Sequence, residues 1–205
     1  MELSIPWTVA RPLADQPQAR GSQGLTSDDS DLVGRAREGD QVAFARLFEH
    51  YHAPILNYLH RMVGDRAMAE DLTQNVFLRI IKYRGSYREG LRFQSWIYQV
   101  ARNIFSDHYQ AHKNRFSDFI DVEKISDHIP DGGDSELLDE QEKLLQRSMA
   151  LLNEEQRELL VLTRFQHMKY EDVAVIMNTT VANIKVKVHR AIAKLREHYF
   201  ELEKI

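Results

Sequence analysis

The 205-residue sequence predicts an all-α protein made of two small helical domains joined by a flexible acidic linker. Apolar residues recur at steps of three and four over most of the chain, and no segment shows the alternation typical of a strand. A run of helix-breaking residues at 130–134 (PDGGD) places the domain boundary near 116–136. We expect residues 1–30 to form a disordered tail, followed by domains at 31–115 and 137–205.

Charge is strongly segregated along the chain, although the net charge is only −4. Residues 31–115 carry 13 bases and 9 acids, and residues 159–205 carry 8 bases and 5 acids. Between them, residues 116–158 carry 4 bases and 13 acids. Two basic segments on either side of an acidic one indicate two separate contacts with a polyanion such as nucleic acid.

Composition also excludes several classes of protein. The chain has no cysteine, which excludes a disulfide scaffold, a cysteine-ligated metal site and thiol catalysis. No stretch approaches 18 consecutive apolar residues, and the N-terminus lacks the basic and apolar parts of a secretory signal. We therefore expect a cytoplasmic protein that does not insert into a membrane.

In the N-terminal domain we expect helices at about 41–63, 68–82 and 93–113, from apolar residues at helical spacing. Pro54 should kink or break the first of them, and Gly64-Asp65 should form the turn that follows it.

The segment between the second and third of these helices is rich in arginine and aromatic residues. Residues 82–115 hold 7 bases and only 2 acids, interleaved with tyrosine, phenylalanine and tryptophan. Aromatic rings can stack on unpaired bases while guanidinium groups hold phosphates. Phe93 and Trp96 have core spacing, whereas Tyr87 and the loop arginines are harder to explain as core residues.

The C-terminal domain has the pattern of a helix-turn-helix. After a helix at 137–152, Asn153 opens the next one as part of a capping box. A short helix at 170–177, a turn at 178–180 and a long helix from 181 then follow. Asn178 suits a left-handed turn position and Thr180 suits an N-cap. The long helix has 5 bases and no acid over 181–196, which is typical of a helix that enters the major groove.

Three segments resemble functional segments of bacterial sigma factors, in the same order. Residues 69–79 (AEDLTQNVFLR) resemble the helix that binds core RNA polymerase, and residues 93–103 (FQSWIYQVARN) resemble the promoter-melting helix. Residues 184–191 (IKVKVHRA) are similar to the helix that reads the −35 element. The resemblance is to the extracytoplasmic function (ECF) group of the sigma-70 family, whose members keep only regions 2 and 4.

The resemblance implies an alternative sigma factor. Its region 2-like domain would bind core polymerase, read the −10 element and help to melt it, and its region 4-like domain would read the −35 element. The implied partners are core RNA polymerase, through its largest and second-largest subunits, promoter DNA, and an anti-sigma factor that can hold the protein at the membrane. In the holoenzyme the protein would be associated with the nucleoid, and the acidic linker would thread through the RNA exit path. No catalytic residue, cofactor or metal is implied.

The resemblance also implies three sets of site residues. The core-binding set is Asp71, Gln74, Asn75 and Arg79. The −10 set is Arg84, Tyr87, Arg88, Arg92, Arg102, Asn103 and Asp107. The −35 set is Thr180, Asn183, Lys185, Val186, Lys187, Arg190 and Lys194. Two places depart from the family pattern, because Asn75 stands where Glu is usual and Val186-Lys187 stands where Ser-Arg is usual. The second departure should change the bases read there.

Two other functions stay open on the residues alone. A stand-alone helix-turn-helix transcriptional regulator with an N-terminal effector domain would need no polymerase, but it would have no use for the aromatic and arginine-rich helix. A metal enzyme could use His108 and His112, which have the i, i+4 spacing of metal ligands, but no HExxH motif or third ligand accompanies them.

Overall fold

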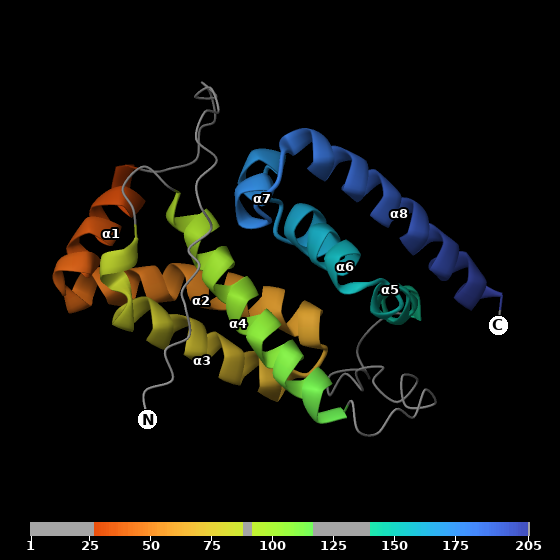
Figure 1. Ribbon diagram of the computed structural model, residues 1–205, viewed down its shortest axis with the longest axis horizontal. Helices are drawn as coiled ribbons and strands as arrows, with labels where there is room; N and C mark the ends of the chain where they lie inside the picture. Colours follow the sequence, from red (N-terminus) through yellow and green to blue (C-terminus); the bar gives the residue numbers. More distant parts are fainter. Residues whose placement is uncertain (1–26, 88–91, 117–139, 205) are drawn as a thin grey trace.

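The computed structural model describes residues 27–87, 92–116 and 140–204, which are helical almost throughout (Figure 1). The elements are α1 (Ser27–Glu38), α2 (Gln41–Val63), α3 (Arg66–Lys82), the 3-10 turn η1 (Arg84–Ser86), α4 (Phe93–Phe116), α5 (Glu140–Ala150), α6 (Glu154–Leu160), the π-helical turn η4 (Val161–Phe165), α7 (Tyr170–Ile176) and α8 (Val181–Glu203). The predicted all-α class is confirmed. None of these helices is long and apolar enough to span a bilayer.

The first helix begins earlier than the sequence predicted. Helix α1 begins at Ser27, inside the range assigned to the tail, and the acidic residues that follow Ser27 favour a helix N-terminus. The rest of that tail, Arg88 and almost all of the acidic linker at 116–136 lie outside the described residues.

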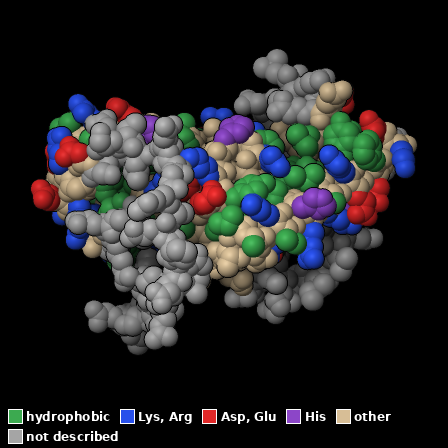
Figure 2. All heavy atoms as spheres, turned by 90° about the horizontal axis from the view of Figure 1, so that it is seen from above, with side chains coloured by type: hydrophobic (Ala, Val, Ile, Leu, Met, Phe, Trp, Pro, Cys, Tyr) green, Lys and Arg blue, Asp and Glu red, His purple; other side chains and the backbone are tan. Residues whose placement is uncertain are grey.

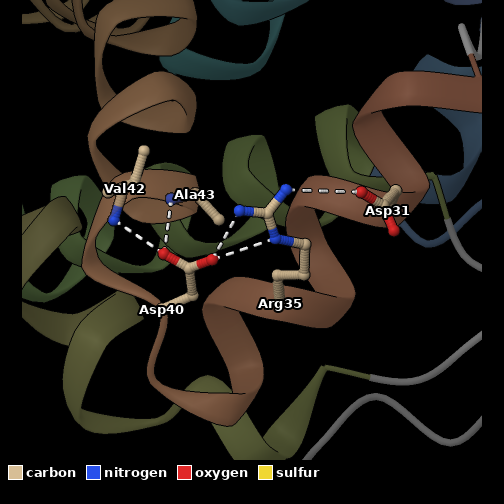
Figure 3. Close-up of polar contacts among 5 residues, drawn as sticks. All are labelled: Asp31, Arg35, Asp40, Val42 and Ala43. Atoms are coloured by element: carbon tan, nitrogen blue, oxygen red, sulfur yellow. Dashed lines mark hydrogen bonds and ion pairs between the residues drawn. The ribbon is translucent and has the colours of Figure 1, made fainter.

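A capped corner joins α1 to α2. One carboxylate oxygen of Asp40 accepts hydrogen bonds from the backbone amides of Val42, at 2.8 Å, and Ala43, at 3.1 Å (Figure 3). The other oxygen accepts from the Nε of Arg35 at 2.9 Å and from its Nη2 at 2.6 Å. Asp31, one turn earlier in α1, lies 3.7 Å from the same guanidinium. Asp40 thus caps α2 and ties it to the preceding helix.

This corner predicts a pH-dependent stability. The Arg35 guanidinium and the Ala43 amide lower the pKa of Asp40 below its ordinary value of 3.8. The stabilisation is therefore complete above pH 4 and is lost as the pH falls through the lowered pKa. We expect Asp40→Ala to lower the thermal unfolding midpoint by a few degrees at pH 7, and Asp40→Asn to lower it less, because asparagine still caps. In acid the wild-type midpoint should fall to that of Asp40→Asn, because only the wild-type side chain titrates; a constant difference between these two chains at all pH values would contradict this role.

Of the two outcomes expected at Pro54, a kink or a break, the structure excludes the break. Helix α2 runs without interruption from Gln41 to Val63 with Pro54 inside it. Proline inside a helix costs about 3 kcal/mol. The residues around it, Tyr51, Ile55, Tyr58 and Leu59, are all buried, and each contributes roughly 1.5–3 kcal/mol. Tertiary burial therefore outweighs the local cost.

The remaining helix boundaries follow from local signals. Gly64 ends α2 in the left-handed region at φ 80°, and Asp65 caps α3 by accepting from the amide of Met68. This cap starts α3 at Arg66, two residues before the predicted start at 68.

In the C-terminal domain the predicted turn chemistry is confirmed. Asn153 and Gln156 form the reciprocal capping box of α6, and Asn178 has a φ of 50° between α7 and α8. The hydroxyl of Thr180 accepts from the amide of Asn183 at 3.2 Å and starts α8. The helix-turn-helix is thus built as its sequence indicates.

The two domains pack against each other, which the sequence did not predict. The buried apolar residues form one cluster that includes members from α1 to α8. Helices α2 and α4 of the N-terminal domain face α6, η4 and α7 of the C-terminal domain (Figure 1). Helix α8 lies on the outer side of α6 and α7, away from α2 and α4 (Figure 1).

Candidate polymerase and nucleic-acid interface

The −35 set lies on the outward face of the first half of α8. Ile184, Val188 and Ala191 are buried on the inner face and fix the orientation of the helix. The opposite face presents exposed Asn183, Lys185, Val186 and Arg190, with Lys187 and Lys194 half-exposed. Thr180, at the start of the helix, is exposed as well. Figure 2 shows basic side chains spread over the C-terminal domain, among apolar and a few acidic ones.

Members of this set differ in their intramolecular contacts. The ammonium group of Lys187 is held by Glu155 of α6, and that of Lys194 lies 2.8 Å from Glu197. Asn183 donates from its side chain to the hydroxyl of Thr179 at 2.8 Å. Lys185 and Arg190 form no ion pair with any side chain in the described ranges. These two bases are therefore the most available to a phosphate backbone.

The core-binding set lies on one face of α3. Asp71, Gln74 and Asn75 are exposed, and Arg79 is half-exposed. Leu78 lies among them and exposes 62% of its surface. Sequence reasoning missed Leu78, although it stands outside the inward row of Leu72, Val76 and Ile80. An apolar side chain surrounded by polar ones is typical of the centre of a protein–protein contact.

A hollow of about 460 Å³ lies between α3 and α4 beside this face. Its lining includes Asn75, Leu78 and Arg79 from α3. Asp107 of α4 lines the same hollow, and its carboxylate lies 3.4 Å from Nη1 of Arg79. Asp107, which was assigned to the −10 set, is thus grouped by the structure with the core-binding face.

The other members of the −10 set fall into separate environments. Tyr87 packs with Phe93 and Trp96 at ring distances of 6.0 and 5.4 Å, so it belongs partly to the aromatic core. Arg84 is exposed in η1, and Asn103 is exposed on α4.

A second hollow of about 460 Å³ adjoins this cluster, between α1, α2, α3 and α4. Arg84 lies at its edge, and the rings of Phe44, Tyr87, Phe93 and Trp96 line it. A hollow with aromatic walls and a nearby guanidinium has the chemistry to hold an unstacked base.

Arg92 and Arg102 point toward the C-terminal domain. Nη1 of Arg92 donates to Oδ2 of Asp172 at 2.6 Å, and Ser95 lies 3.4 Å from the other oxygen of that carboxylate. Nε of Arg102 donates to Oε2 of Glu158 at 3.0 Å. Two of the arginines assigned to −10 DNA are therefore paired with carboxylates of the other domain.

The carboxylate of Glu158 is the most buried charge in this interface. Its second oxygen accepts from the hydroxyl of Tyr58 at 2.9 Å. Burial raises the pKa of Glu158, partly offset by Arg102 and Tyr58. Burial also raises the pKa of Tyr58. Both side chains that donate to the Glu158 carboxylate therefore belong to the N-terminal domain.

Further polar contacts complete the interface. The hydroxyl of Tyr98 donates to Gln166 at 2.8 Å, and the side chain of Gln99 donates to the carbonyl of Val175 at 2.8 Å. The guanidinium of Arg61 lies over the ring of Phe165 at 3.9 Å. The interface is therefore rich in hydrogen bonds as well as apolar contacts.

Sequence reasoning missed Glu158 and Asp172. Both stand at inward helical positions, directly before Leu159 and Val173, and both are buried. The signal in the sequence that could have identified these two residues is an acidic side chain at a helical position that faces the core. The described residues hold no group of three or more metal-ligating side chains, and the side chain of His112 lies outside them.

Comparison with known proteins identifies the two regions of this chain. The family model for sigma-70 region 2 matches residues 47–115, and that for sigma-70 region 4 matches residues 142–195. RNA polymerase sigma factor CarQ of Myxococcus xanthus is 32% identical over 82% of this chain and 96% of its own length. ECF RNA polymerase sigma factor BldN of Streptomyces coelicolor is 30% identical over 90% of this chain and 68% of its own.

Solved structures share the fold. CnrH, in complex with the cytosolic domain of CnrY, has a TM-score of 0.64 at 19% identity and covers 83% of this chain and 96% of its own. Sigma factor RpoE of Bartonella quintana, in complex with the anti-sigma factor NepR, has a TM-score of 0.61 at 21% identity, over 76% of this chain and 95% of its own. With both regions present in order, the chain belongs to the ECF group of sigma-70 RNA polymerase sigma factors, non-enzymatic initiation factors that direct RNA polymerase to promoters.

Proposed function

We propose that this sigma factor uses three separate surfaces in transcription initiation. The polar face of α3 around Leu78 binds core polymerase, the outward face of α8 reads the −35 element, and η1 with α4 holds the melted −10 strand. The observation that carries the proposal is the exposed face of α8 over residues 181–196, which hold no acid, on a correctly capped helix-turn-helix. On this proposal residues 31–115 and 137–205 are the two functional domains.

The core contact is supported by the composition of the α3 face. An exposed leucine is surrounded there by an acid, two amides and a base. This combination suits a partner helix that offers an apolar groove with complementary charges. A stand-alone regulator has no need of such a surface, so membership of the sigma family accounts for α3 better than the alternative function does.

We also propose that the protein acts in the cytoplasm and is held there by an anti-sigma factor. The structural neighbours CnrH and RpoE were solved with CnrY and with the anti-sigma factor NepR. When it is released, the protein would join core polymerase on the nucleoid, with its acidic segment in the RNA exit path. Since the chain has no cysteine, a redox signal would have to act on the partner.

The α8 surface makes a specific prediction. Lys185→Ala and Arg190→Ala should each weaken binding to duplex −35 DNA and lower the slope of log affinity against log salt by about 1. Fluorescence anisotropy over a salt series, with DNA selected by the holoenzyme, measures this slope. Run-off transcription by the same variants should fall in parallel.

The matched control is Arg196→Ala. Arg196 is exposed on the same helix, about 9 Å further along its axis than Arg190. We expect this variant to keep the wild-type slope. Equal losses in all three variants would mean a general charge effect rather than a groove contact.

A further inference from the structure

We propose that the hollow between α3 and α4 is a second part of the core-polymerase contact, and that it receives an apolar side chain of a polymerase helix lying across Leu78. On this inference Asp107 of α4 is a positioning residue, which holds Arg79 of α3 ready for the polymerase and does not touch promoter DNA. The inference rests on the core-binding role proposed for the α3 face.

The hollow continues the exposed face of α3 onto α4. Leu72 and Ile104, one from each helix, are buried and line it with apolar surface. Leu78 and Tyr83, which also line it, expose 62% and 38% of their surface. A hollow with apolar walls beside an exposed apolar side chain is the kind of pocket that receives an anchor residue at the centre of a protein–protein contact.

The charges along α3 favour a protein helix as the occupant. Asp71 lies in the first half of α3, whereas Arg79 and Lys82 lie in its last turn and line the hollow. About 12 Å of helix axis separate Asp71 from Arg79. A partner helix that carries a carboxylate near its apolar anchor and a base about two turns away would complement both ends. A nucleic-acid strand, which is negative along its whole length, would be repelled by Asp71 and Asp107.

The ion pair between α3 and α4 sets the direction of the Arg79 side chain. Nη1 of Arg79 lies 3.4 Å from Oδ2 of Asp107, and the two side chains are 36% and 69% exposed. A pair this exposed contributes little to the stability of the free chain. It does restrict a long, flexible side chain before the partner arrives, which lowers the entropy cost of binding. Asp107 therefore acts on binding through Arg79.

A double-mutant cycle on core binding tests this positioning role in the full chain. Asp107→Asn should lower the affinity for core polymerase about fivefold, and Arg79→Gln about tenfold. The double variant should bind no more weakly than Arg79→Gln alone, because Asp107 acts through that side chain. Asp107→Glu, which keeps the carboxylate, should bind core like the parent chain. The free energy of unfolding should be the same in all four variants.

The matched control for this cycle is Asp31→Asn, which removes an exposed carboxylate from another arginine, Arg35 of α1. It should leave the affinity for core unchanged. Losses that multiply in the double variant would overturn the positioning role. So would an Asp107→Asn chain that binds core normally and selects promoters with a different −10 sequence, because Asp107 would then act on promoter DNA.

Site-directed cross-linking tests whether the polymerase enters the hollow. Because the sequence has no cysteine, a single cysteine can carry a photoreactive benzophenone. His108→Cys places it in the lining of the hollow on α4, and Gln74→Cys places it on the exposed face of α3. Gln110→Cys is the control, since Gln110 is exposed about 200° around the α4 axis from His108.

We expect the labels on His108→Cys and Gln74→Cys to cross-link to the same subunit of core polymerase, and the label on Gln110→Cys to give no such product. A cross-link from Gln74→Cys without one from His108→Cys would overturn the inference and leave the proposed function intact. A product of His108→Cys with promoter DNA or with a second copy of this chain, in place of the polymerase, would overturn it as well. Absence of a core cross-link from both would refute the core contact proposed for α3 itself.

Discussion

Arg157→Ala is expected to destabilise the protein by about 3 kcal/mol, because the guanidinium of Arg157 donates hydrogen bonds to backbone carbonyls at the C-terminal ends of two helices. Arg157 donates to the carbonyls of Met149, at 3.2 Å, and Ala150, at 2.7 Å, at the end of α5. It also donates to Leu152 at 3.2 Å, and to Met62 at the end of α2 at 3.1 Å. Cations at helix C-termini are favoured by the helix dipole, and the loss of this one leaves several carbonyls unpaired.

Urea unfolding followed by circular dichroism measures this effect. Arg157→Lys should be nearly as destabilising, because a single ammonium group cannot reach carbonyls on two helices as the planar guanidinium group does. The control is Arg147→Ala on α5, an exposed arginine whose loss should cost less than about 0.5 kcal/mol. If the free energies of unfolding of Arg157→Ala and Arg147→Ala agree within error, Arg157 does not have this role.

Leu78→Glu is expected to lower affinity for core polymerase, and run-off transcription with it, by about 100-fold. Leu78 is the exposed apolar side chain at the centre of the α3 face, and a carboxylate there would be desolvated without a partner on binding. The free energy of unfolding should be unchanged, because Leu78 packs little in the free chain. Binding is measured with labelled chain and core polymerase.

The comparison variant is Val42→Glu, which also places a carboxylate on an exposed apolar position, at the start of α2 and outside the α3 face. It should transcribe like the wild-type chain. A normal level of transcription by Leu78→Glu would show that the core contact lies elsewhere on the molecule.

The helix-turn-helix and most helix ends were predictable from the sequence because their causes are local. The capping box at Asn153, the left-handed Asn178 and the Thr180 cap each depend on residues no more than a few positions away. The continuity of α2 through Pro54 has the opposite origin, since the burial that keeps this helix unbroken comes from contacts with other helices.

The contact between the domains could not be predicted in the same way. Glu158 finds Arg102 across 56 positions of sequence, and Asp172 finds Arg92 across 80. In the sequence, Glu158 counts only as the last acid of an acidic segment, and no local pattern identifies its partner.

Part of the −10 assignment could have been refined from helix geometry alone. Arg102 and Asp107 are five positions apart on α4. That spacing places them about 140° apart around the helix axis, so they cannot share one face. The structure separates them accordingly, Arg102 toward Glu158 and Asp107 toward Arg79.

The most direct measurement of the central claim is run-off transcription with purified core polymerase and this chain on a promoter library. Binding of the library to the chain alone is measured beside it. If the chain uses three separate surfaces as proposed, specific transcripts should appear only when core polymerase and the chain are both present. The promoters used should share −35 and −10 sequences. Tight, specific duplex binding by the chain alone, with no transcript and no association with core, would contradict the account.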